Sequence, residues 1–179
     1  MPNDEERLVA ELELLGIRYL SRQTAYVAAC VRPADQLLAD FTRQPSARVR
    51  QALIALLLAH PEYAGAAPAA LTHLPSSRQL TLKLLYTAAV LLQQEHVQQL
   101  NPLLGDRWST LPDFFSADLG IEVTGTPRDR LRDLGRVHRR DTGIVANWAG
   151  TYENVVHKLL RSLQRAEQMS ICLISTPSR

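Results

Sequence analysis

The stretch SRQLTLKLLYTAAVLLQQEHVQQL (77–100) predicts a long helix that packs into the core of the protein. Its apolar residues recur three and four positions apart, which places them on one face of a helix. We expect Ser76 or Ser77 to cap the start of this helix and Pro102 to follow its end. The residues expected to point toward the core are Leu80, Leu84, Leu85, Ala88, Leu91 and Leu92.

A second helix is predicted just upstream, in PSARVRQALIALLLAH (45–60). Pro45 and Ser46 begin it, and Pro61 ends it. The segment resembles one helix of a HEAT-type repeat, so a HEAT-like structural scaffold is one interpretation. A solenoid needs such a unit about every 40 residues, three or more times, and the chain contains no second copy. The residues expected on the buried face are Val49, Leu53, Leu56, Leu57 and His60.

The N-terminal part of the chain predicts further helices. Asn3 and Glu6 form a capping box at the start of the first one. The small apolar residues of 24–31 indicate a second, central helix, and Pro33 restarts the chain as a third. The buried face of the first helix is expected to consist of Leu8, Leu12, Leu15 and Tyr19, and that of the third helix of Leu37, Leu38 and Phe41.

Two helices are predicted near the C-terminal end. Thr126 and Pro127 provide a cap and a first helical residue for one of them, and Gly143 ends it. Thr151 is expected to cap the other. The apolar face of that last helix consists of Val155, Val156, Leu159, Leu160, Leu163 and Ala166.

The fold class that these patterns predict is all-α, an irregular multi-helix bundle of eight or nine helices. At most two short strands are expected, at 121–124 and 171–174. The length fits a single helical domain over residues 1–179. The segment 101–113 holds two prolines and a glycine, which makes it a candidate subdomain junction.

Nothing in the sequence predicts insertion into a membrane or export. The longest apolar runs, 52–59 and 84–92, are about nine residues each, against the roughly 18 needed to span a bilayer. The N-terminus is acidic and has no basic region followed by an apolar stretch, unlike a signal peptide. Cys30 and Cys172 lie far apart, as free thiols in a reducing compartment do. We therefore expect a cytoplasmic protein that does not contact a membrane.

The positive charge of the chain is concentrated near its C-terminal end. Residues 127–165 hold nine basic and four acidic side chains, a net charge of +5, whereas the whole chain carries +2. Many of these basic residues recur at four-residue spacing on the two predicted helices. The asymmetry predicts a surface that contacts an acidic protein or a nucleic acid; two solvated helix faces are the alternative. The candidate contact residues are Arg128, Arg132, Arg136 and Arg140 on one helix and His157, Lys158, Arg161 and Arg165 on the next.

The sequence contains no motif of a metal-dependent or nucleotide-dependent enzyme. A glycine-rich phosphate loop, G-x-S-x-G and H-E-x-x-H are all missing. The histidines do not pair with one another at three-residue or four-residue spacing, so we expect no metal ligands and no organic cofactor. The histidines are His60, His73, His96, His138 and His157.

One pair of residues matches a known class of nuclease. Five residues separate Arg132 from His138, and this spacing resembles the R-x(4–6)-H motif of HEPN-type ribonucleases, small all-α domains that cleave RNA without a metal. The resemblance implies that His138 would transfer a proton while Arg132 holds the scissile phosphate. One such match is no more than chance predicts for a chain so rich in arginine.

The central third resembles a further group of proteins. PSARVRQALIALLLAHPEY (45–63) and LKLLYTAAVLLQ (82–93) are similar to segments of uncharacterised helical bacterial proteins associated with minimal nucleotidyltransferases. The likeness covers roughly residues 45–95 and transfers no catalytic residue. It implies a partner subunit or antitoxin-like regulator. We therefore predict a non-catalytic helical protein that binds a protein partner, with nucleic-acid binding and homo-oligomerisation left open.

Overall fold

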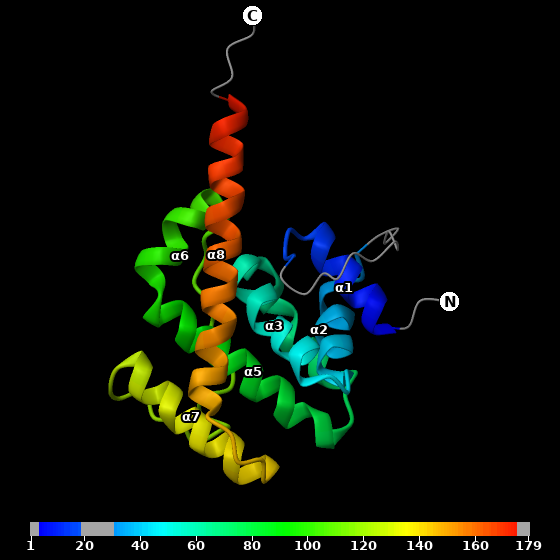
Figure 1. Ribbon diagram of the computed structural model, residues 1–179. Coiled ribbons are helices and arrows are strands. Elements are labelled where there is room, and N and C mark those ends of the chain that lie inside the picture. Colours follow the sequence, from blue (N-terminus) through cyan, green and yellow to red (C-terminus); the bar gives the residue numbers. More distant parts are fainter. Residues whose placement is uncertain (1–3, 19–30, 175–179) are drawn as a thin grey trace, which may run out of the picture.

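The computed structural model of the protein describes residues 4–18 and 31–174, and within these ranges its regular structure is entirely helical (Figure 1). The prediction of an all-α, multi-helix bundle is confirmed. Asn3, Tyr19 and most of the helix expected at 24–31 lie outside the described residues. The described helices are α1 (Asp4–Leu14), α2 (Ala34–Arg43), α3 (Ala47–Ala59), α4 (Ala67–Thr72), α5 (Ser76–Glu95), α6 (Val97–Leu104), α7 (Pro127–Thr142) and α8 (Trp148–Ile174), with 3-10 turns η1 (Pro61–Ala66) and η2 (Gly105–Arg107).

The two short strands expected from the sequence are wrong. Residues 121–124 form an irregular connection without a partner strand in the described chain, and Ile121 is its buried residue. Residues 171–174 continue α8 to its end. A β-branched run of four residues specifies a strand only where another strand supplies its hydrogen bonds, and this bundle provides none in the described ranges.

Helices α3 and α5 form the centre of the bundle. Every residue of α3 from Ala52 to Ala59 is buried, because α1, α2, α5 and α8 all pack against this helix. The predicted inward face of α5 is buried as well, apart from Leu80, which is half-buried. One hydrophobic cluster runs from Leu8 in α1 to Leu160 in α8. The apolar patterns that predicted these helices therefore define the core.

The ends of α3 and α5 test the capping predictions. Helix α3 starts directly after Pro45 and Ser46, as predicted, and the Ser46 hydroxyl caps it by accepting a hydrogen bond from the Val49 N–H. Helix α5 begins at Ser76 with Pro75 at the cap position and no side-chain cap, so the expected serine cap is wrong. The chain leaves helical geometry at His96 (φ −104°, ψ 21°) and restarts as α6. Pro102 therefore lies inside α6 and does not follow the end of the long helix.

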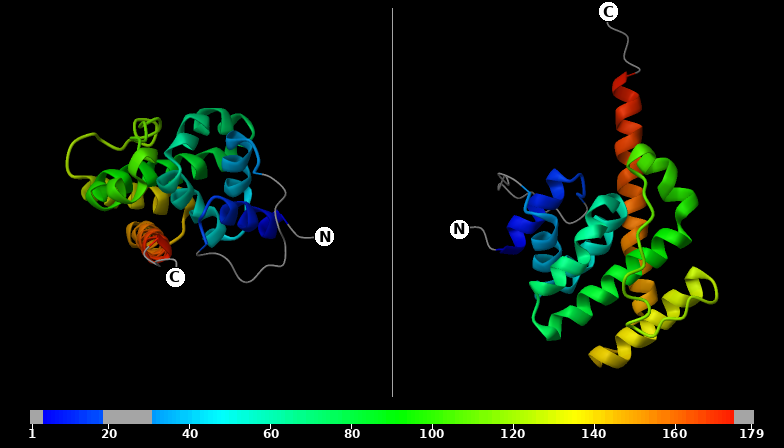
Figure 2. Two further views of the ribbon diagram at one scale, coloured as in Figure 1. Left: turned by 90° about the horizontal axis from the view of Figure 1, so that it is seen from above. Right: turned by 180° about the vertical axis from the view of Figure 1, so that it is seen from behind.

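The segment 101–113 is held against α5. The Gln93 side chain donates to the Ser109 carbonyl and accepts from the Leu111 N–H, at 2.8 Å in both cases. The Tyr86 hydroxyl donates to the Pro112 carbonyl at 2.8 Å. Figure 2 shows the connection beyond α6 running down the face opposite that of Figure 1 to reach α7. Core residues on both sides of this segment belong to the one hydrophobic cluster.

Arg130 anchors the same connection to α7. Its side chain is buried, and its Nε donates to the Glu122 carbonyl at 2.9 Å. Its Nη2 lies 3.2 Å from Asp113 Oδ2 and 3.3 Å from Ser116 Oγ. The guanidinium thus satisfies polar groups of the loop between α6 and α7, and its charge is unavailable to a ligand at the surface.

Helix α7 lies across the first turns of α8 and does not run alongside it (Figure 1). The close approach occurs at Gly135, where an added Cβ would lie 3.3 Å from the Ala149 backbone nitrogen. Helix α8 begins at Trp148, because Asn147 Oδ1 accepts from the Gly150 N–H at 3.0 Å. The expected cap Thr151 instead lies in the first turn, and its hydroxyl donates to the Asn147 carbonyl.

The outer half of α8 extends beyond the rest of the bundle (Figures 1 and 2). Val155, Val156, Leu159 and Leu160 are buried, whereas Ala166 is exposed, so only the first part of the predicted apolar face is covered. None of the helices in the described ranges is both long enough and apolar enough to span a bilayer.

Candidate binding site

The predicted arginine row on α7 is exposed but largely paired with aspartates. Thr126 accepts from the Asp129 N–H and Gly143 ends the helix in the left-handed region (φ 69°), as predicted. Arg132 lies 3.1 Å from Asp129, and two further arginine–aspartate pairs form within the same helix. They are Arg136 with Asp133 and Arg140 with Asp141.

Arg128, the first residue of the row, has no ion pair with a described residue. The same holds for Arg139, which is also exposed. Exposed ion pairs such as the three on α7 contribute only a few tenths of a kcal/mol each to the stability of the fold. The three arginine–aspartate pairs nevertheless reduce the positive electrostatic potential that the arginine row presents to a ligand. Helix α7 alone is therefore a weak electrostatic surface.

The basic residues of α8 are exposed. Lys158, Arg161 and Arg165 form no ion pair with a described residue, whereas His157 lies 3.9 Å from Glu153. Because α7 crosses α8 near Gly135, the α8 residues extend away from the crossing along the projecting helix (Figure 1).

The structure does not bring Arg132 and His138 together. His138 is buried, its Nδ1 lies 2.5 Å from the Tyr152 hydroxyl, and its ring stacks on Trp148 with the centroids 3.6 Å apart. The Arg132 side chain is exposed and bonds to Asp129. The sequence spacing of the two residues thus corresponds to different faces of α7.

His138 instead forms part of a pocket that the sequence did not predict. The pocket has a volume of about 180 Å³ and lies between the beginnings of α3 and α5 and the end of α7. We call it the two-arginine pocket. Its lining consists of Ala47, Arg50, Gln51, Arg78, Thr81, Leu85, His138, Thr142, Ile144 and Trp148.

Two like charges face this pocket without a carboxylate in its lining. Arg50 is held in place because its Nη1 donates to the carbonyls of Gln44 and Pro45, at 2.6 and 2.7 Å. Burial, together with the positive charge of Arg78, lowers the pKa of Arg50. Both guanidinium groups remain charged at neutral pH, so the pocket has a positive potential that an anion would neutralise.

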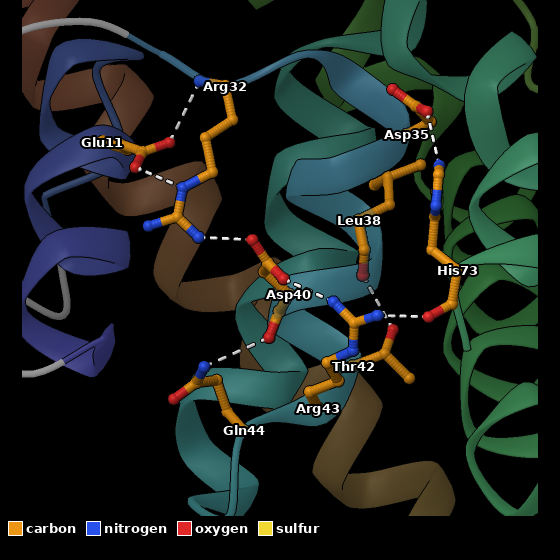
Figure 3. A network of polar contacts seen from close by, with 9 residues as sticks. All are labelled: Glu11, Arg32, Asp35, Leu38, Asp40, Thr42, Arg43, Gln44 and His73. Carbon is orange, nitrogen blue, oxygen red and sulfur yellow. Dashed lines mark hydrogen bonds and ion pairs between the residues drawn. The ribbon is translucent and has the colours of Figure 1, made fainter. Parts of the chain in front are cut away.

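A polar network elsewhere in the molecule shows the contrasting arrangement (Figure 3). Arg32 lies 2.9 Å from Glu11 and also bonds to Asp40. Arg43 lies 2.7 Å from Asp40 and donates to the His73 carbonyl. Here each arginine meets a carboxylate, so the network joins α1 to α2 and leaves little net charge for a ligand. The open groove beside it, about 730 Å³, is lined by both signs of charge.

His138 enters the pocket as a neutral ring. Burial, reinforced by the positive charge of Arg50, lowers the pKa of His138 to about 4. Burial also raises the pKa of the Tyr152 hydroxyl, which therefore stays protonated. If the Tyr152 hydroxyl donates to His138 Nδ1, Nε2 carries the ring proton. The imidazole can thus serve as a hydrogen-bond donor for an acceptor in the pocket.

Trp148 lines both the two-arginine pocket and a second hollow of about 270 Å³. Three α7 arginines also line that hollow. Ile144 and Val145, in the connection before α8, are large apolar residues left 52% and 75% exposed. Cationic and apolar groups are therefore combined around one aromatic residue. The arginines of the second hollow are Arg132, Arg136 and Arg139.

Sequence reasoning missed Arg50 and Arg78 because nothing in the sequence connects them. They are 28 positions apart on different helices, and each sits in the polar first turns of a mostly apolar segment. The available signal was weak: an arginine on the border of a buried helix needs an acceptor or a ligand. No family model matches this chain, and neither does any curated protein or any solved structure.

Proposed function

We propose that this protein is a non-catalytic helical binding protein, and that the two-arginine pocket and the surface around Trp148 receive an acidic, partly apolar segment of a protein partner. The observation that carries the proposal is the juxtaposition of Arg50 and Arg78 without a carboxylate in the pocket lining. Both guanidinium groups face the same pocket, and an anionic group binding between them would relieve their repulsion.

The surroundings of the pocket favour a protein over a nucleic acid. A volume of about 180 Å³ suits a single carboxylate-bearing side chain better than a polymer backbone. Ile144 and Val145 add exposed apolar surface next to it, and arginine beside aromatic and apolar groups is characteristic of protein interfaces. A phosphate backbone is usually bound by an extended row of free cations, whereas three of the four arginines in the α7 row pair with aspartates.

A role as partner subunit or antitoxin-like regulator fits this surface. The resemblance of residues 45–95 to helical proteins associated with minimal nucleotidyltransferases supports such a role. Arg50 and Arg78 both lie within that part of the chain. The expected partner therefore presents an acidic segment with at least one apolar anchor residue.

Site-specific cross-linking tests the proposal. A photoreactive residue is placed at Val145, beside the pocket, and in a matched variant at Val123, which is 82% exposed in the connection before α7. In cells that carry the gene, Val145 should cross-link to one protein through an acidic peptide, and Arg78→Glu should abolish this product. Identical products from both positions, or cross-links to RNA alone, would rule the proposal out.

The nuclease alternative requires Arg132 and His138 to act on one phosphate. In this chain Arg132 is exposed and His138 is enclosed by Tyr152 and Trp148, so the geometry supports this function less well than binding. An assay of RNA cleavage by the purified protein, with single-stranded RNA as substrate, tests the nuclease alternative. Cleavage that Arg132→Ala abolishes would replace the binding proposal. The HEAT-like scaffold interpretation stays a prediction, to be preferred if neither a partner nor cleavage is found.

A further inference from the structure

Three potential metal ligands converge where α8 passes the break between α5 and α6. His96 Nε2 lies 2.9 Å from Glu153 Oε2, and His157 Nε2 lies 3.9 Å from the same oxygen. One ligand atom from each residue lies within 4.8 Å of the other two. The rings of His96 and His157 meet edge to face, with their centroids 5.8 Å apart.

The local structure holds these groups in place. Glu153 and His157 are four residues apart on α8, so they share one face of that helix. His96 ends α5, where its N–H donates to the Leu92 carbonyl at 2.9 Å. The other ring nitrogen of His96, Nδ1, lies 3.1 Å from Gln99 Oε1, and this contact helps to fix the orientation of the imidazole.

The contact with Gln99 matches the arrangement that is usual at metal-binding histidines. A histidine that binds a metal through one ring nitrogen donates the hydrogen of the other to an oxygen acceptor, which fixes the tautomer and the ring orientation. If Nδ1 donates to Gln99, the Nε2 lone pair of a neutral His96 points at the Glu153 carboxylate. A cation between the nitrogen and the oxygen removes that repulsion.

We propose that His96, Glu153 and His157 form a Zn²⁺ site with an open coordination position. Two imidazole nitrogens and one carboxylate oxygen are typical zinc ligands, whereas Mg²⁺ and Ca²⁺ prefer oxygen alone. Tetrahedral zinc with ligand bonds of about 2.0–2.1 Å separates its ligand atoms by about 3.3 Å, a value between the two distances measured to Glu153 Oε2. The His157 side chain is half exposed, which leaves room for water as the fourth ligand.

Other histidine–carboxylate pairs in the described chain lack the third ligand. His60 pairs with Glu62, and His73 pairs with Asp35, each as one imidazole with one carboxylate. The cluster at His96 is the single group of three that the described residues form. The zinc ion would join α8 to the α5–α6 break and would stabilise the folded chain, since it binds the native arrangement only. This site is separate from the two-arginine pocket and does not depend on its function.

The test is zinc binding to the chelator-treated, full-length protein. Isothermal titration with Zn²⁺ should show one site per chain, and Zn²⁺ but not Mg²⁺ should raise the melting temperature. His157→Ala, at an exposed position that leaves the core intact, should lower the affinity more than about 100-fold, and Gln99→Ala by about 10-fold. His73→Ala, which removes a histidine of comparable exposure from a two-residue pair, should leave the affinity unchanged.

Cobalt substitution distinguishes this site from adventitious binding. Co²⁺ bound to the wild-type protein should give the visible absorption bands of four-coordinate cobalt without a thiolate charge-transfer band, and His157→Ala should lose these bands. The proposal is overturned if wild type and His157→Ala bind Zn²⁺ equally, if His73→Ala weakens binding as much as His157→Ala, or if the cobalt spectrum shows sulfur ligands. Circular dichroism of each metal-free variant verifies that it is folded.

Discussion

Arg50 and Arg78 line one pocket and repel each other: the positive charge of Arg78 contributes to the lowered pKa of Arg50. Arg50 comes from the first turn of α3, and Arg78 comes from the first turn of α5. Both helices have apolar central turns that are fixed in the core. The core packing of α3 and α5 therefore keeps the two arginines at the same pocket.

This repulsion predicts that a small anion stabilises the protein. Millimolar phosphate should raise the melting temperature of the wild type by a few degrees over chloride at equal ionic strength. Arg78→Gln should lose that increase and change the free energy of unfolding in chloride by no more than about 0.5 kcal/mol, because Arg78 has no ion pair with a described residue. As a control, Arg43→Gln removes an arginine already paired with Asp40 and should keep the response to phosphate. An equal response in Arg78→Gln would mean that phosphate acts elsewhere.

The buried His138 predicts a loss of stability in mild acid. Its pKa is about 4 in the folded protein, because of burial and Arg50, with Asp141 acting weakly in the opposite direction; in the unfolded chain it is about 6.5. Above pH 6.5 both states are neutral and the group has no effect. As the pH falls from about 6.5 to 4, the unfolded chain binds the proton first, which destabilises the fold by on the order of 3 kcal/mol.

Urea unfolding between pH 7 and pH 4 measures this effect. His138→Gln cannot titrate but can still bond to the Tyr152 hydroxyl, so its stability should fall less steeply with pH than that of the wild type. The difference between the two profiles isolates the histidine from the carboxylates that titrate in the same range. Parallel profiles down to pH 4 would show that His138 is protonated in the folded state.

The crossing of α7 and α8 predicts a size limit at Gly135. A Cβ added at this position would lie only 3.3 Å from the Ala149 backbone nitrogen. The larger side chain of Gly135→Val should therefore push the two helices apart. We expect the free energy of unfolding to fall by about 1–3 kcal/mol. Gly65→Val is the matched control, since a Cβ at that position would meet nothing within 4 Å. Chemical denaturation of both variants measures the difference, and equal stability would show that the crossing can widen freely.

The same substitution at two arginines near the start of α7 should have very different effects on stability. Arg130→Met leaves Asp113 and the Glu122 carbonyl without their buried partner and should cost about 3–5 kcal/mol of unfolding free energy. Arg128→Met, two residues earlier and exposed, should change it by no more than about 0.5 kcal/mol. A small effect of Arg130→Met in calorimetry would mean that the loop between α6 and α7 is not held by this guanidinium.

The helices could be predicted from the sequence because their patterns are local. Leu84 and Leu91 in α5 lie seven residues apart, on one helical face, and both are buried, as is Leu53 in α3. Thr126 and Gly143 bound α7 as expected. The strands at 121–124 and 171–174 were wrong because four residues of β-branched or apolar composition do not reveal whether a partner strand exists. The serine cap of α5 was wrong because Pro75 occupies that position.

The candidate sites depend on long-range proximity, which a single sequence does not contain. Arg130 contributed to the positive charge counted over 127–165, but the fold buries it beside Asp113. His96 and His157 looked unrelated at a separation of 61 positions, yet Glu153 lies close to both. The sequence shows the spacing of Arg132 and His138, but it does not show that Arg132 is exposed whereas His138 is buried against Tyr152.

Helix α8 is one continuous element with two environments. From Val155 to Leu160 its inward residues are covered by the bundle, whereas 164–169 are exposed on every side. The backbone amides of the covered turns can exchange with deuterium only when the bundle opens, but those of the outer turns need only local fraying. The helix should therefore show a steep gradient of hydrogen-exchange rates along its length. A partner that covers the outer turns would be detected as protection of those amides alone.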